Sequence, residues 1–141
     1  MFAGLRPTEA ARLTWQNVNL KDRELRLEGS QTKTGRPRVM AIGNTLAAWL
    51  QVCEGKPFWP ASAVNDWKVV RRKAGFEKWC QDVLRHTAIS HYFRKTGSYG
   101  ETAEHFGNSE GIIKQHYQGR ASSTDTKKFY ALRPMSAKPP H

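Results

Sequence analysis

The segment 83–96 has apolar residues at the spacing of an amphipathic helix. At about 100° per residue, one arc of this helix carries Leu84, Ala88, Ile89, Tyr92 and Phe93. Arg85 lies near the middle of the same arc, so we expect its guanidinium group to be partly buried. A guanidinium keeps its charge, and an unpaired buried charge is costly. Arg85 therefore needs an anionic partner, and the helix alone leaves open whether this is a carboxylate or a phosphate.

Capping residues mark the ends of this helix and of three helices that follow it. The predicted N-caps are, in chain order, Asp82, Ser98 with Glu101, Asn108 or Ser109, and Ser122 with Asp125. The predicted ends are Gly97, Gly107, Gly119 and, for the last helix, about Leu132. We expect residues 134–141 to form a flexible tail.

Alternating apolar residues predict two strands in the first half of the chain, ELRLEG at 24–29 and RVMAI at 38–42. The polar loop between them predicts a hairpin, whose tip carries Lys33, Arg36 and Arg38. These three cations form either a solvated turn or a finger that enters a groove of nucleic acid. Short helices are also predicted at 8–13, from Asn44 as cap to 52, and from Asn65 or Asp66 as cap to Gly75.

The charge of the chain indicates a polyanionic partner. Its 141 residues suit one domain, and its formal net charge is +11, which favours nucleic acid over a membrane. The helix ending at Gly75 adds a cationic surface with Lys68, Arg71 and Arg72, for which we favour phosphate contact over a merely solvated face. Because no apolar run approaches ~18 residues and no secretory signal is recognisable, we expect a cytoplasmic protein.

The spacing of cysteines and histidines predicts no metal site. Cys53 and Cys80 form no C-x-x-C pair, and the five histidines form no H-E-x-x-H or similar ligand set. We expect two reduced, partly buried thiols and no structural metal.

Four motifs, GLRPTE, TKTGRPR, LRHTAISHYF and FGNSEGIIKQHY, occur in an order and at separations that resemble the catalytic domain of tyrosine recombinases, the phage-integrase family. The resemblance covers residues 1–133 and implies an α+β, mainly α fold with a small antiparallel sheet. It also implies that the N-terminal part of the family domain and a separate DNA-binding domain are absent from this sequence. The implied activity is cleavage of one DNA strand through a 3′-phosphotyrosine and rejoining to another strand.

Matching motif to motif, the resemblance assigns roles to individual residues. Arg6 and Arg85 match the arginines that clamp the scissile phosphate, with Glu9 at the family's acidic position. Lys33 matches the general acid on the hairpin, and Tyr117 matches the nucleophile. The implied DNA contacts are Lys33, Arg36, Arg38, Lys68, Arg71, Arg72 and His86, the last being the residue after the second arginine. The resemblance implies no nucleotide cofactor and no metal.

Two positions depart from the family pattern. Asp82 stands where the family often has histidine, three residues before the second arginine, and Asn108 stands in place of a later histidine or tryptophan. Asp82 is either a helix cap or an acceptor for the tyrosine proton. Asn108 is either a cap or a hydrogen-bond donor to a phosphate oxygen. Both stay candidate catalytic residues.

Three functions remain open at this point. The first is a recombinase or integrase catalytic domain, whose nicking chemistry type IB topoisomerases share. The second is a truncated, non-catalytic DNA-binding remnant of an integrase, and the third is a basic nucleic-acid-binding protein in which Tyr117 only packs. The implied partners are double-stranded DNA and, on DNA, a homotetramer in which the 122–132 helix docks in cis or in trans. Without DNA we expect a monomer or weak association.

Overall fold

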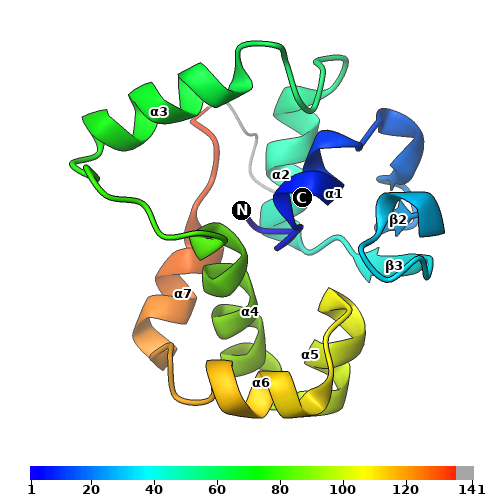
Figure 1. Ribbon diagram of the computed structural model, residues 1–141, viewed down its shortest axis with the longest axis vertical. Helices are drawn as coiled ribbons and strands as arrows, with labels where there is room; N and C mark the ends of the chain where they lie inside the picture. Colours follow the sequence, from blue (N-terminus) through cyan, green and yellow to red (C-terminus); the bar gives the residue numbers. More distant parts are fainter. Residues whose placement is uncertain (136–141) are drawn as a thin grey trace.

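The structure is a computed structural model that describes residues 1–135 (Figure 1). This part of the chain forms seven α-helices and a three-stranded antiparallel sheet. The elements are α1 (Pro7–Ala11), β1 (Val18–Asn19), β2 (Glu24–Leu27), β3 (Arg38–Ala41), α2 (Asn44–Cys53), α3 (Ala63–Lys73), α4 (Val83–Thr96), α5 (Tyr99–Phe106), α6 (Glu110–Tyr117) and α7 (Ser123–Ala131). The expected α+β, mainly helical fold is confirmed. Most of the predicted tail lies outside the described residues. No helix within residues 1–135 has the length and apolar character needed to cross a bilayer.

The predicted hairpin is formed by β2 and β3, and the strand order is β1-β2-β3. The register pairs Leu25 with Met40 and Leu27 with Arg38. Directly paired residues of antiparallel strands point to the same face, and three of these four side chains are buried in the core. Arg38 therefore lies on the inner face of the sheet, whereas Val39 is 51% exposed. The expectation that Arg38 belongs to the exposed hairpin tip is wrong.

Helix α4 is the central element of the C-terminal half and contacts α5, α6 and α7 (Figure 1). Its predicted apolar arc is confirmed, because Ala88 and Ile89 are buried in one cluster with Phe106 of α5 and Ile113 of α6. The cluster continues into the sheet and α2, so the same core supports both halves of the chain.

Serine side chains cap α5, α6 and α7, as the sequence predicts. The Oγ atoms of Ser98, Ser109 and Ser122 accept hydrogen bonds of 3.2, 3.4 and 3.0 Å from the backbone N–H three residues further on. Ser109 is thus the cap of α6, and Asn108 is available to make other contacts. Asp82 is the N-cap residue of α4, as predicted, with φ of 55°, but its side chain accepts no hydrogen bond from the N–H groups of the first turn.

Three local predictions also need correction. Helix α2 includes Asn44, because Gly43 already has the extended backbone of an N-cap residue. Helix α3 starts at Ala63, earlier than predicted. Cys53 and Cys80 are exposed rather than partly buried, because one ends a surface helix and the other lies in the loop before α4.

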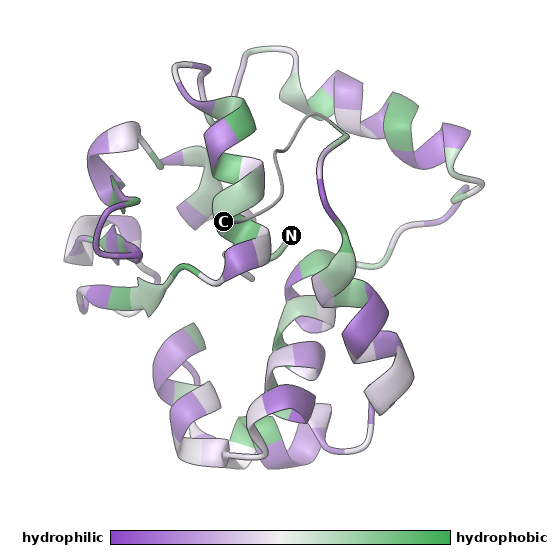
Figure 2. Ribbon diagram, turned by 180° about the vertical axis from the view of Figure 1, so that it is seen from behind, coloured by the Kyte–Doolittle hydropathy of each residue, from purple (hydrophilic) through white to green (hydrophobic). Residues whose placement is uncertain are grey.

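Helix α3 lies apart from the other helices in both views (Figures 1 and 2). None of its residues is buried, and Val64, Val69 and Val70 are 55%, 49% and 54% exposed. Loops on both sides connect it to α2 and α4.

Candidate active site

Three arginine side chains converge between the start of α1, the inner face of β3 and the first turn of α4. Arg6 and Arg38 have side chains that are 20% and 10% exposed, and Arg85 is 6% exposed. The predicted burial of Arg85 is therefore confirmed. We call these three residues, with Glu9 and Asn108, the arginine cluster.

Glu9 is the carboxylate that holds two of the arginines. Its Oε1 lies 3.1 Å from Nη1 of Arg6, and its Oε2 lies 3.1 Å from Nη2 of Arg38. The backbone N–H of Arg6 also donates to Oε2 at 2.9 Å. Burial acts to raise the pKa of Glu9, but the hydrogen bonds from Arg6 and the charge of Arg38 outweigh it and lower the pKa. Glu9 is therefore ionised at neutral pH.

Arg85 is held by neutral oxygen atoms. Its Nη1 donates to the carbonyl oxygen of Gly4 at 2.6 Å, and its Nη2 donates to the carbonyl oxygen of Phe106 at 2.8 Å and to Oδ1 of Asn108 at 3.2 Å. Within residues 1–135, no carboxylate forms a salt bridge with it. Burial, aided by the charge of Arg6, lowers the pKa of Arg85 to about 10, so it remains cationic at neutral pH. The carboxylate partner that the helix pattern left open is not found in this part of the chain.

The arginine cluster has an excess of positive charge. Three guanidinium groups and the one carboxylate of Glu9 leave two positive charges uncompensated among the described residues. Since guanidinium groups are suited to bind oxyanions at fixed geometry, the cluster is electrostatically ready for a phosphate.

Two glycines allow the backbone to approach the arginines. Gly4 has φ of 57°, and a side chain there would collide with Phe106 while its carbonyl accepts from Arg85. Gly107 has φ of 65°, and a side chain there would collide with the Arg38 guanidinium. Both positions need a left-handed backbone and no side chain.

Asn108 bridges the two predicted phosphate-clamping arginines. Its Oδ1 accepts from Nη2 of Arg85 at 3.2 Å and from Nη2 of Arg6 at 3.4 Å. Of the two roles left open by the sequence, the capping role is wrong, because Ser109 caps α6. The amide oxygen of Asn108 thus lies between two guanidinium donors, a position that also suits an oxygen of a phosphate.

Tyr117 ends α6 and is 5% exposed. Its hydroxyl lies 2.8 Å from Nδ1 of His86 on α4, and the two rings are 5.6 Å apart between centroids. Burial raises the pKa of Tyr117, whereas the charges of Arg85 and Arg6 act to lower it and the charge of Asp82 acts to raise it. The phenol is thus within electrostatic reach of the arginine cluster.

A polar groove of about 1140 Å³ connects the hairpin loop with the arginine cluster. Its lining includes Arg6, Lys33, Arg36, Arg38 and Asn108. Lys33 and Arg36 are exposed, so they can reach a ligand that lies in the groove. The predicted general acid, Lys33, and one arginine of the predicted phosphate clamp, Arg6, therefore border the same hollow.

The structure brings together half of the twelve sequence-predicted site residues. Those in or next to the arginine cluster are Arg6, Arg38, Arg85, His86, Asn108 and Tyr117. Lys68, Arg71 and Arg72 lie on α3, away from the cluster. The side chain of Asp82 makes no hydrogen bond within residues 1–135, although its charge acts on Tyr117. No group of three or more metal-binding side chains occurs in the part of the chain described.

Two features of the site were missed by sequence reasoning. The pairing of Arg38 with Glu9 has a weak signal, since alternation along β3 puts Arg38 on the same face as Met40. The contact between His86 and Tyr117 has no signal in the sequence, because it joins two helices whose packing the sequence pattern does not specify.

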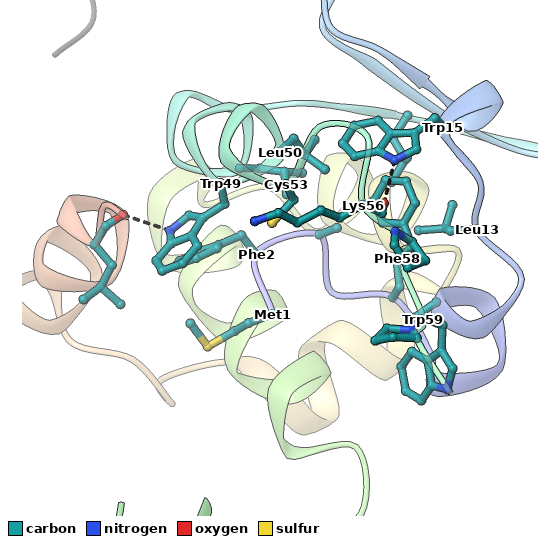
Figure 3. Close-up of a pocket in the computed structure, with 18 residues that line it drawn as sticks. Met1, Phe2, Leu13, Trp15, Trp49, Leu50, Cys53, Lys56, Phe58 and Trp59 are labelled. Carbon is teal, nitrogen blue, oxygen red and sulfur yellow. Dashed lines mark hydrogen bonds between the residues drawn. The ribbon is translucent and has the colours of Figure 1, made fainter. Parts of the chain in front are cut away.

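A second hollow, of about 790 Å³, is apolar and lies on another part of the molecule (Figure 3). Its lining includes Met1, Phe2, Trp15, Trp49, Phe58 and Trp59. The indole N–H of Trp15 donates to the carbonyl oxygen of Lys56 at 2.8 Å, which fixes one wall (Figure 3). Charged side chains are nearly absent from this lining, in contrast to the groove beside the arginines.

Comparison with known proteins places the chain in a family. The sequence profile of the phage integrase family matches residues 1–122, which include the arginine cluster, His86 and Tyr117. The crystal structure of XerA recombinase is similar in fold, with a TM-score of 0.63 and 17% sequence identity over 92% of this chain and 53% of that chain. This chain thus spans about half the length of that structure. No match was found among curated proteins. The extent of the profile match shows that the chain belongs to the phage integrase family.

Proposed function

We propose that this chain is the catalytic domain of a site-specific DNA recombinase, which cleaves one DNA strand through a 3′-phosphotyrosine at Tyr117 and rejoins it to another. The observation that carries this proposal is the arginine cluster, whose excess positive charge lies near the Tyr117 phenol, since the Tyr117 hydroxyl is 2.8 Å from Nδ1 of His86, the residue after Arg85. Membership of the phage integrase family supports the same function.

Arg6 and Arg85 clamp the scissile phosphate. A phosphodiester resists nucleophiles because it is negatively charged, and its transition state places more charge on the equatorial oxygens. Donors that are already fixed in place stabilise that charge, and each contributes on the order of 10²–10³ in rate. Arg85 is fixed by Gly4 and Phe106, and Arg6 is fixed by Glu9. One phosphate oxygen takes the acceptor place of Asn108 between them.

Tyr117 acts as the nucleophile of strand cleavage, and Lys33 acts as the general acid. The phenolic oxygen of Tyr117 forms a bond to phosphorus while the bond from phosphorus to the 5′ oxygen breaks. The ammonium group of Lys33 gives its proton to the departing 5′ oxygen. Rejoining is the reverse, with a 5′ hydroxyl attacking the phosphotyrosine. The exposed position of Lys33 on the groove suits a flexible acid that reaches a bound strand.

DNA contacts are made by the hairpin loop and by α3. Lys33 and Arg36 border the groove, and α3 carries further cations that are free to meet phosphates. Arg38, also predicted as a DNA contact, lines the same groove and is paired with Glu9, as Arg6 is. Helix α7 packs on α4 of the same chain, where Thr126 bonds His91, which supports docking in cis in the free protein. Assembly of a tetramer on DNA remains a prediction.

A non-catalytic DNA-binding protein is the second candidate. It is favoured by Asp82, which departs from the family pattern and makes no side-chain hydrogen bond within residues 1–135. A carboxylate near the scissile phosphate is also repulsive unless Arg85 compensates its charge.

Covalent trapping distinguishes the two candidates. The protein is incubated with a library of nicked duplexes of random core sequence. Cleavage releases a short downstream fragment with a free 5′ hydroxyl, which diffuses away. We expect a phosphotyrosyl adduct that survives denaturation. Tyr117→Phe should abolish it, whereas Tyr99→Phe should not, because Tyr99 only stacks on Phe93. DNA binding without any adduct across the library would establish the non-catalytic function instead.

A further inference from the structure

His86 is the hydrogen-bond partner of the proposed nucleophile. Its Nδ1 lies 2.8 Å from the Tyr117 hydroxyl, and the two residues are 31 positions apart on different helices. The Tyr117 side chain makes no other hydrogen bond within residues 1–135. A side chain that is to take a proton must be within hydrogen-bond reach of it, and this geometry meets that condition before any DNA is bound.

The surroundings of this pair allow the proton to leave. His86 is exposed, whereas Tyr117 is buried. A polar hollow of about 550 Å³ adjoins both residues. An imidazole with one nitrogen on the phenol and its other nitrogen open to water can accept a proton on one side and exchange it with solvent on the other.

Other candidate bases are less well placed. Asp82, which stands at the family's histidine position, makes no hydrogen bond to Tyr117, and its negative charge acts to raise the pKa of the phenol. His91 bonds Thr126 through Nδ1, at 2.9 Å. His116 neighbours Tyr117 on α6, but its ring centroid is 6.4 Å from that of Tyr117.

We infer that His86 is the general base of strand cleavage, an inference that rests on the proposed recombinase function. The Tyr117 O–H bond breaks and its proton moves to Nδ1 of His86, while the phenolic oxygen forms its bond to phosphorus. The bond from phosphorus to the 5′ oxygen breaks, and that oxygen takes a proton from Lys33. In rejoining, the imidazolium of His86 returns its proton to the oxygen of Tyr117.

The charges around the pair decide how its reactivity depends on pH. Arg6 and Arg85 act on Tyr117 from the arginine cluster, and Asp82 acts on it from the start of α4. The titratable or charged groups that line the hollow beside His86 are His91 from α4, His116 from α6, Arg120 from the segment between α6 and α7, and Asp125 from the first turn of α7.

The test compares His86→Gln with the unaltered protein in single-turnover adduct formation. Glutamine can still bond the Tyr117 hydroxyl but cannot take its proton, and Asp82→Asn serves as the matched control at the competing position. Each protein is given two nicked substrates at saturating concentration, one natural and one with sulfur in place of the bridging 5′ oxygen. The sulfur leaves without protonation, so this substrate bypasses Lys33 and reports on the nucleophile alone.

We expect His86→Gln to slow adduct formation about 10²–10⁴-fold on both substrates. Lys33→Ala should be slow on the natural substrate only. Because burial raises the pKa of Tyr117, the His86→Gln rate should keep rising with pH, about tenfold per unit. The unfolding midpoint should be nearly unchanged, because His86 is exposed and glutamine can still bond the Tyr117 hydroxyl. The saturating substrate keeps any change in DNA affinity out of the measured rates.

Two results overturn the inference while leaving the proposed function intact. One is a His86→Gln protein that forms adduct as fast as the unaltered protein at every pH. The other is a loss of rate on the sulfur substrate in Asp82→Asn but not in His86→Gln, which would make Asp82 the base. Absence of adduct from the unaltered protein overturns the proposed function itself.

Discussion

The arginine cluster and helix α3 are both strongly basic, but they are built in opposite ways. In the cluster, Arg6 and Asn108 bond each other across 102 positions of sequence, and Arg85 bonds Gly4 across 81. Helix α3 carries its cations within 11 residues, and none of its side chains is buried. The cluster is therefore fixed by the whole fold, whereas α3 is held by its own backbone hydrogen bonds.

The two kinds of basic region suit two different tasks, stabilising a transition state and binding a DNA backbone. Stabilising a transition state requires charges that are fixed before the reaction, and long-range contacts supply that rigidity. Binding a DNA backbone requires charge but little fixed geometry. The apolar hollow belongs to neither basic region, and its lining includes large apolar side chains such as Trp59, which is 45% exposed (Figure 3).

Glu9→Gln should produce the largest effect on stability. It keeps the shape of the side chain but leaves three buried or half-buried guanidinium groups with no carboxylate among the described residues. Removing one partner of a buried ion pair costs about 3–5 kcal/mol. Urea unfolding measures this loss, and Glu104→Gln, at an exposed position, is the matched control with a change within about 0.5 kcal/mol. Equal losses of unfolding free energy in the two variants would show that the ion pairs of Glu9 do not stabilise the fold.

Acid should lower the free energy of unfolding through protonation of His105, whose pKa is affected by Arg38 of the arginine cluster. Burial and the charge of Arg38 lower its pKa from 6.5 to about 4. The folded protein thus binds fewer protons than the unfolded chain between these values, so stability falls as pH drops from 6.5 towards 4. The shift corresponds to at most about 3 kcal/mol.

The measurement is the free energy of unfolding in urea at several pH values. His105→Gln should flatten the profile over this window. The lowered pKa of Glu9 acts in the same direction at lower pH, where its carboxylate becomes protonated. An unchanged slope in His105→Gln would place the acid sensitivity elsewhere.

Local features of this fold could be predicted from sequence, and long-range ones could not. Ser98, Ser109 and Ser122 were recognisable as caps because they bond groups three residues away. The burial of Arg85 followed from helical periodicity in the same way. The partners of a buried charge depend instead on which segments meet in three dimensions, so the bonds from Arg85 to Gly4 and Phe106 had no local signal.

The family resemblance supplied the candidate residues, but it did not supply their contacts. It correctly gave the family and the fold, but it gave no sign that the side chain of Arg38 turns inward to Glu9. A sequence motif records which residue types occur at a position, and the direction of a side chain is determined by strand register.

The smallest effect on stability should come from α3. Replacing Lys68, Arg71 and Arg72 together by alanine should change the free energy of unfolding by only about 0.5 kcal/mol per site, because no residue of α3 is buried. If α3 contacts phosphates, the slope of log affinity against log salt should fall by about one per cation removed. Lys127→Ala on α7, away from the groove, is the control and should leave the slope unchanged. A slope that stays the same in the triple variant would remove α3 from the DNA interface and leave the hairpin loop as the basic surface that binds DNA.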